Sequence, residues 1–262
     1  MKITVKGQDA RMRRLASLIS EGGETWNFDA VLLLPIPSTR DGIHINGTDE
    51  TFNSVEPVHG GGRAIAVGYS LPPYAADTLR KAGYREILDL LYDDAFSDGN
   101  TALTTLAALG HIPKADGRAL TDLTVGICGY GRLGKSLCRA LLFLGARVIV
   151  WTSNACVRRS LGACGIDTRY REYGRPVYDL SGVDVFINTA PCPCLADEAD
   201  TREVSVIELA SGDNFPGRED ILRLPSLPAK EYPESAARLC LLALRRYADR
   251  ERTYREDTEG KE

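Results

Sequence analysis

The sequence predicts an α/β protein with two Rossmann-like domains, each built on a parallel sheet, and a cleft between them. Short apolar runs alternate with segments of helical apolar spacing along most of the 262 residues. This alternation is typical of parallel sheets with connecting helices. A Gly-x-Gly-x-x-Gly turn follows an apolar run in the second half of the chain, as it does in dinucleotide-binding domains. The length is sufficient for two modest domains.

The first expected domain covers residues 1–112. Its strands are short apolar runs, at residues 1–6, 30–34, 63–69 and 85–91. A helix is expected after the turn Gly7-Gln-Asp-Ala-Arg11, because Leu15, Leu18 and Ile19 share one helical face. A second helix is expected at residues 74–82. The order of strands and helices predicts a parallel sheet.

Between the second and third expected strands, residues 38–62 are rich in Gly, Ser, Thr, Asn and Asp. This composition predicts a long loop. Structureless loops of more than about 12–15 residues are usually functional or disordered. The loop is therefore a candidate source of site residues.

The second expected domain covers residues 113–232 and follows a helix at 101–109 and a linker at 111–117. Its strands are again apolar runs, at residues 125–128, 146–150, 183–189 and 204–209, and a helix around Leu161 follows the second of them. A final amphipathic helix near residues 233–250 is expected to return to the first domain. The charged tail, residues 251–262, has no apolar anchors, and we expect it to be disordered.

The glycine motif predicts a dinucleotide site. Gly129 makes the turn out of the strand, Gly131 lets the backbone approach a pyrophosphate, and Gly134 lets the new helix pack on the strand. Free N–H groups at the helix N-terminus attract phosphate, and a second apolar run follows at the distance that a βαβ unit requires. The alternative is a turn that binds nothing. The predicted pyrophosphate contacts come from the motif itself: Gly129, Tyr130, Gly131, Arg132, Leu133 and Gly134.

The end of the second strand favours NADP over NAD. NAD-binding units carry an Asp or Glu about 20 residues past the first glycine, whereas this strand ends in Trp151, Thr152, Ser153 and Asn154. Arg158 and Arg159 follow, and guanidinium groups suit a 2′-phosphate. The alternative is that both arginines belong only to a solvated helix face.

Two further strand ends are expected to line the nicotinamide, because ligands of open parallel sheets bind beyond the carboxyl ends of the strands. The candidates are small residues after these strands: Thr189, Ala190, Pro191, Ala210 and Ser211. Each group could instead form an ordinary turn.

Charge and hydropathy exclude several other classes. The net charge is −4 and there is no Lys/Arg-rich run, which argues against nucleic acid or an anionic membrane as partner. No segment reaches the about 18 apolar residues of a membrane span. The first residues lack the apolar core of a signal peptide, so we expect a cytoplasmic protein.

The seven cysteines do not predict a disulfide framework, because their number is odd and they are spread through expected helices and strands. Cys192 and Cys194 are the one close pair, and no histidine follows His111. A zinc site would therefore need thiolates alone. We expect reduced packing residues and no metal.

Several segments together resemble the NADP-dependent A subunit of dipicolinate synthase, over most of the chain. The segments that carry the resemblance are Gly7-x-Asp9-Ala-Arg11, Gly129-Tyr-Gly-Arg-Leu-Gly134, Ala140 to Val150, Ile187-Asn-Thr-Ala-Pro191, Leu209-Ala-Ser211 and Leu227 to Ala237. No single segment is specific, but their order and spacing are.

The resemblance implies oxidation of a dihydrodipicolinate ring to dipicolinate in spore-forming cells, with hydride transfer to NADP. It also implies a small dicarboxylate substrate and, as partner, a flavoprotein-like B subunit, and we expect a homo-oligomer. Candidates for substrate binding lie at strand ends, in the long loop and near the domain hinge: Arg11, Ser38, Thr39, Arg40 and Asn100. The general base stays unassigned, with Asp98, His44 and His59 as candidates.

Two departures from the family pattern concern the substrate side. Ala102 stands where the family has a carboxylate, and Glu234 stands where it has a cation. Two alternatives therefore remain, a non-catalytic NADP-binding partner or sensor and a D-2-hydroxyacid-dehydrogenase-like enzyme for another small acid. The latter chemistry needs a histidine after the cofactor motif, and none follows His111.

Overall fold

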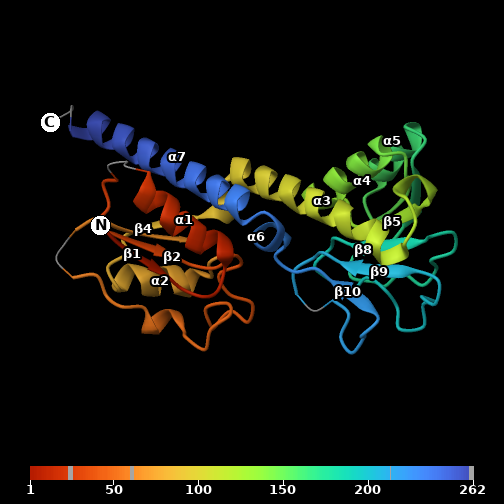
Figure 1. Ribbon diagram of the computed structural model, residues 1–262, viewed down its shortest axis with the longest axis horizontal. Helices are drawn as coiled ribbons and strands as arrows, with labels where there is room; N and C mark the ends of the chain where they lie inside the picture. Colours follow the sequence, from red (N-terminus) through yellow and green to blue (C-terminus); the bar gives the residue numbers. More distant parts are fainter. Residues whose placement is uncertain (23–25, 60–61, 213, 260–262) are drawn as a thin grey trace. The chain divides into compact units, whose positions relative to one another are not determined.

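The computed structural model divides the chain into two compact units (Figure 1). It describes residues 1–22, 26–59, 62–212 and 214–259, with the backbone alone for 114–116 and 252–259. Unit 1 consists of Met1–Asn100 together with Pro228–Glu262, and unit 2 is Thr101–Leu227. The return of the C-terminal helix to the N-terminal unit, predicted from the sequence, is confirmed.

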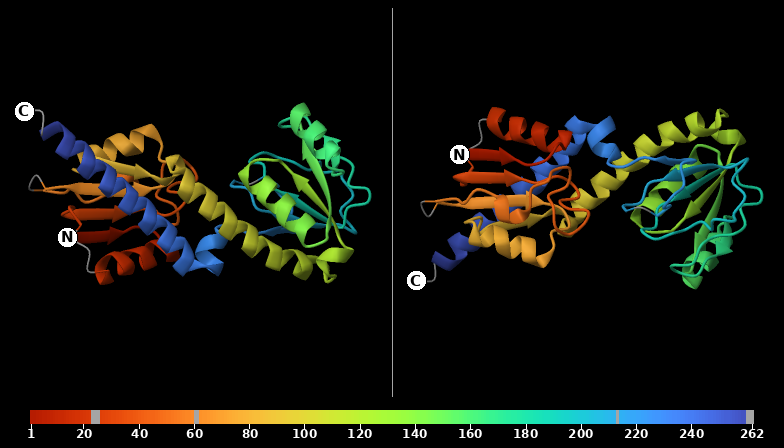
Figure 2. Two further views of the ribbon diagram at one scale, coloured as in Figure 1. Left: turned by 90° about the horizontal axis from the view of Figure 1, so that it is seen from above. Right: turned by 90° about the horizontal axis from the view of Figure 1, so that it is seen from below.

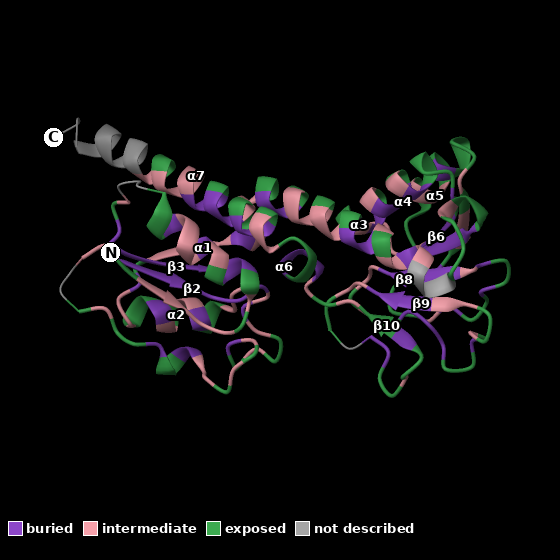
Figure 3. Cartoon of the chain, in the orientation of Figure 1, coloured by how far each residue is buried: buried purple, intermediate pink, exposed green. Residues whose placement is uncertain are grey.

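Unit 1 contains a four-stranded parallel sheet in the order β1-β2-β3-β4. Its strands are β1 (Lys2–Val5), β2 (Ala30–Leu33), β3 (Ala64–Gly68) and β4 (Glu86–Asp89). Every residue of β2 and β3 is buried, and Figure 3 shows the buried β2. Such strands read as continuous apolar runs because both faces of the sheet are covered.

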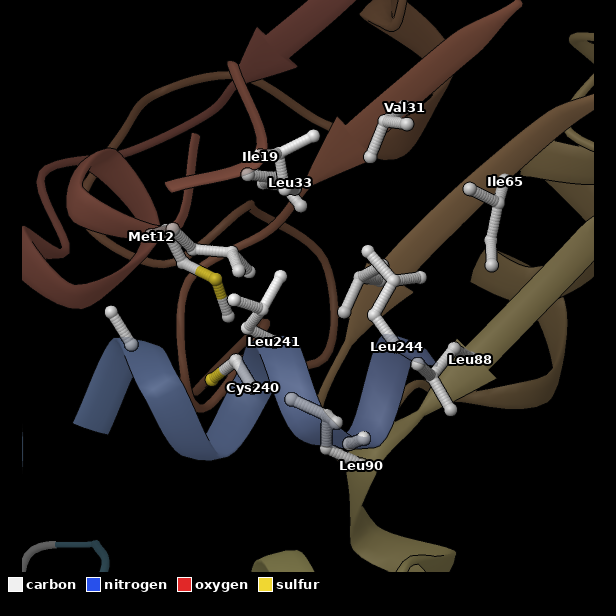
Figure 4. Close-up of a cluster of buried hydrophobic side chains, with 14 of the residues drawn as sticks. Met12, Ile19, Val31, Leu33, Ile65, Leu88, Leu90, Cys240, Leu241 and Leu244 are labelled. Atoms are coloured by element: carbon white, nitrogen blue, oxygen red, sulfur yellow. The ribbon is translucent and has the colours of Figure 1, made fainter. Parts of the chain in front are cut away.

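Helices α1 (Ala10–Glu21) and α7 (Pro233–Glu259) cover one face of this sheet, as the two views of Figure 2 also show. Figure 4 shows Leu241 and Leu244 of α7 pointing toward the strands beside Met12 of α1. Leu244 is completely buried. Burial of each such side chain contributes about 1.5–3 kcal/mol relative to exposure, so α7 is an integral part of unit 1.

Helix α2 (Pro73–Lys81) and the long loop cover the other face. The loop is folded rather than disordered in its described part. Ile45, Phe52 and Val55 are buried against the sheet, and Phe52 opens the short 3₁₀ helix η1 (Phe52–Ser54). These three apolar side chains make the loop part of the core on this face of the sheet.

Unit 2 contains a six-stranded parallel sheet in the order β10-β9-β8-β5-β6-β7. The strands are β5 (Thr124–Cys128), β6 (Arg147–Thr152), β7 (Asp167–Tyr170), β8 (Val185–Asn188), β9 (Ser205–Glu208) and β10 (Ile221–Arg223). This is the order of a dinucleotide-binding Rossmann sheet, whose strand order reverses between β5 and β8. Helices α4 (Arg132–Phe143) and α5 (Ala155–Ala163) connect β5 to β6 and β6 to β7.

Sequence patterns did not predict β7 and β10. β7 reads Asp-Thr-Arg-Tyr with no buried position, and β10 has three residues of which only Ile221 is buried. Such short or polar segments lack the apolar run by which a strand is recognised. They become strands because β6 and β9 offer unpaired edges for pairing.

The expected helix at 101–109 and linker at 111–117 are in fact one helix, α3 (Asp94–Asp116). The Asp93 side chain accepts a hydrogen bond from the N–H of Phe96 at 2.7 Å and so caps the helix before the expected start. Pro113 lies in the last turn of this helix. The boundary between units therefore falls inside α3, after Asn100, and not after residue 112.

The final helix also exceeds its expected end, because α7 continues to Glu259 across the segment expected to be disordered. Arg and Glu, which dominate this segment, are good helix formers. The remaining elements are short: η2 (Leu90–Tyr92), η3 (Leu120–Asp122) and α6 (Leu227–Glu231). Within the described ranges, no helix has the length and apolarity needed to cross a membrane.

The packing of α7 predicts two different outcomes for neighbouring leucines. Leu244→Ala should lower the free energy of unfolding by about 2–5 kcal/mol, because it leaves a cavity under the sheet. Leu242, 46% exposed, is the matched control, and its alanine variant should change stability by no more than about 0.5 kcal/mol. Urea unfolding followed by circular dichroism measures both. Equal losses for the two variants would contradict the packing described here.

Candidate cofactor site

The three glycines of the motif differ in their steric surroundings. Gly129 has a φ of +98°, and a Cβ there would lie 2.8 Å from Thr189 Oγ1. A Cβ at Gly134 would overlap the carbonyl oxygen of Gly129. At Gly131, by contrast, a Cβ would meet nothing within 4 Å. The turn therefore packs tightly at its two ends and leaves open space at its middle glycine.

That open space lies at the N-terminus of α4. Gly131 is the N-cap residue of this helix, and no side chain accepts a hydrogen bond at the cap. The first N–H groups of a helix lack intrahelical partners and favour anions. Gly131 and Arg132 are exposed, whereas Tyr130 and Leu133 are partly buried. The geometry suits a phosphate group approaching the backbone.

The end of β8 is tied to this turn. Thr189 Oγ1 donates a hydrogen bond to the carbonyl oxygen of Cys128 at 2.9 Å, and the Ala190 Cβ lies 3.3 Å from the position of a Cβ at Gly129. β5 and β8 are the strands at which the order of the sheet reverses. Ligands of such sheets bind there, beyond the carboxyl ends of the strands.

Arg158 lies at the end of β6. Its Nη1 donates to the carbonyl oxygens of Thr152 and Ser153, both at 2.9 Å, and its guanidinium stacks on the ring of Tyr170 with 4.9 Å to the centroid. Among the described residues, no contact is recorded for its Nε and Nη2. Arg158 is thus held in place by its neighbours with donors still available for an anion.

The other predicted residues at this end differ in role. Asn154 caps α5, since its Oδ1 accepts from the N–H groups of Cys156 and Val157. Trp151 is 3% exposed and packs edge-on against Phe186, so its side chain belongs to the core. A strand alternates its side chains between faces, and Trp151 points into the core.

Sequence reasoning missed Tyr170, which is 66% exposed at the end of β7. No signal could have found it, because β7 itself has no apolar pattern. Arg159 is exposed on α5 and its Nη2 contacts the sulfur of Cys156 at 3.4 Å.

A buried polar pair fixes the turns after β8 and β9. Asn188 Nδ2 donates to both carboxylate oxygens of Glu208, at 3.1 and 3.2 Å. Asn188 Oδ1 accepts from the N–H of Ala190 at 3.0 Å, and Glu208 Oε1 accepts from the N–H of Ala210 at 2.7 Å. Burial raises the pKa of Glu208, while these donors oppose the rise. The pair thereby holds the turns that carry Pro191 and Ser211.

In unit 1, Arg11 and Ser38 are internal rather than available to a substrate. Arg11 is 2% exposed; its Nε pairs with Asp9 Oδ1 at 2.9 Å, its Nη2 donates to the Ile36 carbonyl at 3.0 Å, and its Nη1 reaches Asn100 Oδ1 at 3.4 Å. Ser38 is completely buried and its Oγ accepts from the N–H of Tyr69 at 2.8 Å. Both side chains satisfy buried groups of the fold.

The loop candidates form a surface turn around Asp41. This carboxylate accepts from the N–H groups of Ile43 and His44, both at 2.8 Å, and from Thr39 Oγ1 at 3.1 Å. His44 Nδ1 lies 2.6 Å from its other oxygen. The hydrogen bond from the His44 side chain is the main reason that the pKa of Asp41 lies well below its usual range. The His44 side chain therefore helps to hold this turn through its contact with Asp41.

Arg40, His59 and Asp98 are exposed. Within the described part of the chain, no recorded hydrogen bond or ion pair joins His44, His59 and Asp98 to one another, so the general base stays unassigned. Arg40 has no recorded partner there either. Of the two arginines predicted to hold a substrate carboxylate, Arg40 is thus the one whose guanidinium is available.

All seven cysteines are free. In the ranges that the structure describes, no group of three or more His, Cys, Asp or Glu side chains could hold a metal ion.

The sequence matches no family model and no curated protein. Solved structures are similar in fold. The A subunit of dipicolinate synthase from Bacillus halodurans is 20% identical with a TM-score of 0.69, covering 94% of this chain and 97% of that one. The A chain of dipicolinate synthase from Bacillus subtilis is 19% identical with a TM-score of 0.67, covering 96% and 97%.

D-lactate dehydrogenase from Escherichia coli is more distant, with 14% identity and a TM-score of 0.52 over 97% of this chain and 98% of that one. The chain therefore has the two-domain Rossmann-type dehydrogenase fold. The resemblance to the A subunit of dipicolinate synthase, predicted from the sequence, is confirmed as a likeness of fold across most of the chain.

The burial of Arg11 predicts a stability effect that Arg40 should not share. Arg11→Ala leaves Asp9 as a buried, unpaired carboxylate, and removing one partner of a buried pair costs about 3–5 kcal/mol. Arg40→Ala should change the free energy of unfolding by no more than about 0.5 kcal/mol. Urea titration of both variants tests this. An Arg11→Ala protein as stable as the wild type would show that the ion pair is dispensable.

Proposed function

We propose that this protein is an NADP-dependent oxidoreductase that acts on a small dicarboxylate, in the manner implied by the A subunit of dipicolinate synthase. The observation that carries the proposal is the combination of an open glycine turn at the reversal of strand order with a held, available guanidinium at the end of β6. The fold likeness to the two dipicolinate synthase structures supports it.

The residues of unit 2 fit such a cofactor. The backbone at Gly131 and the first turn of α4 would hold the pyrophosphate. Arg158 would hold the 2′-phosphate, and no carboxylate stands at residues 151–154 to repel it. The turns fixed by Asn188 and Glu208 would lie beside the nicotinamide. When bound, NADP supplies a hydride acceptor, while the protein orients the substrate and accepts a proton.

On the substrate side, Arg40 is the arginine left for a carboxylate. The departure at Glu234 is also less unfavourable than its charge suggests, because Glu234 forms ion pairs with Arg14 and Arg238. The hydrogen bond from Arg14 is the main reason that the pKa of Glu234 is lowered. Its negative charge is therefore offset within unit 1.

A second candidate is a non-catalytic NADP-binding partner or sensor. One observation favours it: Ala102, an exposed residue of α3, provides no carboxylate where the family has one. A D-2-hydroxyacid dehydrogenase is less well supported, because no histidine follows His111.

The cofactor proposal predicts that NADPH binds more tightly than NADH. Arg158→Ala should weaken NADPH by about 1.5–3 kcal/mol, the range for hydrogen bonds to charged groups, and leave NADH almost unchanged. Arg159→Ala, which removes a neighbouring exposed guanidinium, is the matched control and should have a smaller effect. Titration of both nucleotides by protein fluorescence measures this. Equal affinities of the wild type for NADPH and NADH would refute the assignment of NADP.

The departure at Ala102 predicts slow turnover with normal cofactor binding. A positioned acid–base group contributes about 10²–10⁴ in rate. The double variant Ala102→Glu with Leu103→Gly should therefore oxidise dihydrodipicolinate faster than the wild type at unchanged NADPH affinity. NADPH formation followed by absorbance, with a flavoprotein-like B subunit present, measures the rate. If the wild type is as fast as the variant, position 102 has no catalytic importance.

A further inference from the structure

Arg171 is a buried guanidinium that contacts no carboxylate among the residues that the structure describes. It is 7% exposed. Its Nε donates to the Arg175 carbonyl at 2.7 Å, and its Nη2 donates to the Pro193 carbonyl at 2.7 Å and contacts the sulfur of Cys192 at 3.3 Å. Carbonyl groups satisfy its hydrogen bonds but supply no negative charge. A buried charge without a counter-charge is costly.

Thiols surround this guanidinium. Cys128 and Cys194 are completely buried and hydrogen bond to each other, whereas Cys192 is half-buried and reaches solvent. The hydrogen bond from Cys194, followed by the charge of Arg171, lowers the pKa of Cys128, whereas the same hydrogen bond, followed by burial, raises the pKa of Cys194. Glu208 acts on Cys128 and Cys194 in the opposite direction to Arg171. A thiolate is therefore the natural counter-charge for Arg171, and Cys192 is the thiol in direct contact with it.

The thiols flank the candidate cofactor site. Cys128 is the last residue of β5 and directly precedes Gly129. The N–H of Cys192 donates to the Ala190 carbonyl at 2.8 Å, within the turn that follows β8. A group attached to the Cys192 sulfur would add bulk to this turn, which also carries Ala190 and Pro191 of the candidate site.

We propose that Cys192, held against Arg171, is a reactive thiolate and a modification site for peroxides and other soft electrophiles, and that its modification weakens cofactor binding to unit 2. The second half of this statement rests on the proposed function. Reactive cysteines lie in electropositive and partly exposed surroundings. Cys192 meets both conditions, because its sulfur lies 3.3 Å from Nη2 of Arg171 and the residue is half-buried.

The oxidation step is balanced with hydrogen peroxide as oxidant. The thiolate sulfur attacks one peroxide oxygen, the O–O bond breaks, and the leaving hydroxide takes a proton to become water. Cys192 is oxidised by two electrons to the sulfenic acid while the peroxide is reduced. Reduction needs two equivalents of an external thiol: the first releases water and forms a mixed disulfide, and the second regenerates Cys192.

The reactivity is tested by alkylation of the whole protein with iodoacetamide near neutral pH, with each cysteine peptide followed by mass spectrometry. Cys156 is the matched control, because its sulfur also contacts a guanidinium, at 3.4 Å, but both groups are exposed and solvent screens them. Cys192 should react at least about 10-fold faster than Cys156. Its rate should also fall less than that of Cys156 as the pH is lowered, a comparison that needs no variant.

Arg171→Gln removes the positive charge and should abolish the faster alkylation of Cys192 relative to Cys156. Circular dichroism checks that the variant is folded. Equal rates for Cys192 and Cys156 in the wild type, at every pH, would overturn the assignment of a thiolate.

The link to the cofactor is tested by NADPH titration before and after hydrogen peroxide. The wild type should lose at least about 10-fold in NADPH affinity, recover it with dithiothreitol, and be protected by bound NADPH. Cys156→Ser should behave as the wild type, whereas Cys192→Ser should show no change on peroxide treatment. Fast alkylation of Cys192 with unchanged NADPH affinity would overturn the link. If the protein binds no dinucleotide before treatment, the proposed function is refuted. The alkylation rates would still decide whether Cys192 is a reactive thiolate.

Discussion

The pairing of β5 with β8 is the constraint on which the rest of unit 2 depends. These strands lie at the point where the order of the sheet reverses, with Cys128 opposite Asn188 in the register. The register brings the glycine turn after β5 beside the turn after β8, and the bond from Thr189 Oγ1 to Cys128 fixes their separation. A slip by one residue would turn every side chain of β8 to the opposite face, and Thr189 would lose this bond. This register thus holds the glycine turn against the turn after β8.

Buried polar groups perform a similar task at several strand ends. Arg11 with Asp9 holds the start of α1 to the turn after β2, through the Ile36 carbonyl. Asn188 with Glu208 holds the turns after β8 and β9. Arg171 joins the segment after β7 to the turn that carries Cys192. In each case the side chains satisfy buried backbone groups that would otherwise cost about 1–3 kcal/mol apiece. Strand-end turns, which are the places where ligands bind, are thereby made rigid.

Burial and internal hydrogen bonds also separate the charged side chains that hold the fold from those that are available to a ligand. In unit 1, Arg11 is fully committed to its neighbours, and Glu234 is compensated by Arg14 and Arg238. In unit 2, Arg158 is held by two carbonyl groups and the Tyr170 ring but keeps donors available. Burial and existing hydrogen bonds, rather than residue type, decide which arginine can serve recognition. The charge pattern of the sequence cannot make this distinction.

The sequence by itself determined those features that depend on local periodicity. Continuous apolar runs predicted β2, β3, β5 and β8, because strands buried on both faces contain little else. The spacing of Gly129, Gly131 and Gly134 predicted the dinucleotide turn. Gly129 and Gly134 answer a local steric demand, and Gly131 leaves open space. The amphipathic pattern near residues 233–250 predicted a docked final helix. Only the tertiary structure decided that Trp151 points into the core, that Arg11 is internal and that Tyr170 supports Arg158. It also decided that residues 128, 171, 192 and 194 meet. These features rest on contacts between segments far apart in the chain, and the polar residues that make them carry no periodic signal.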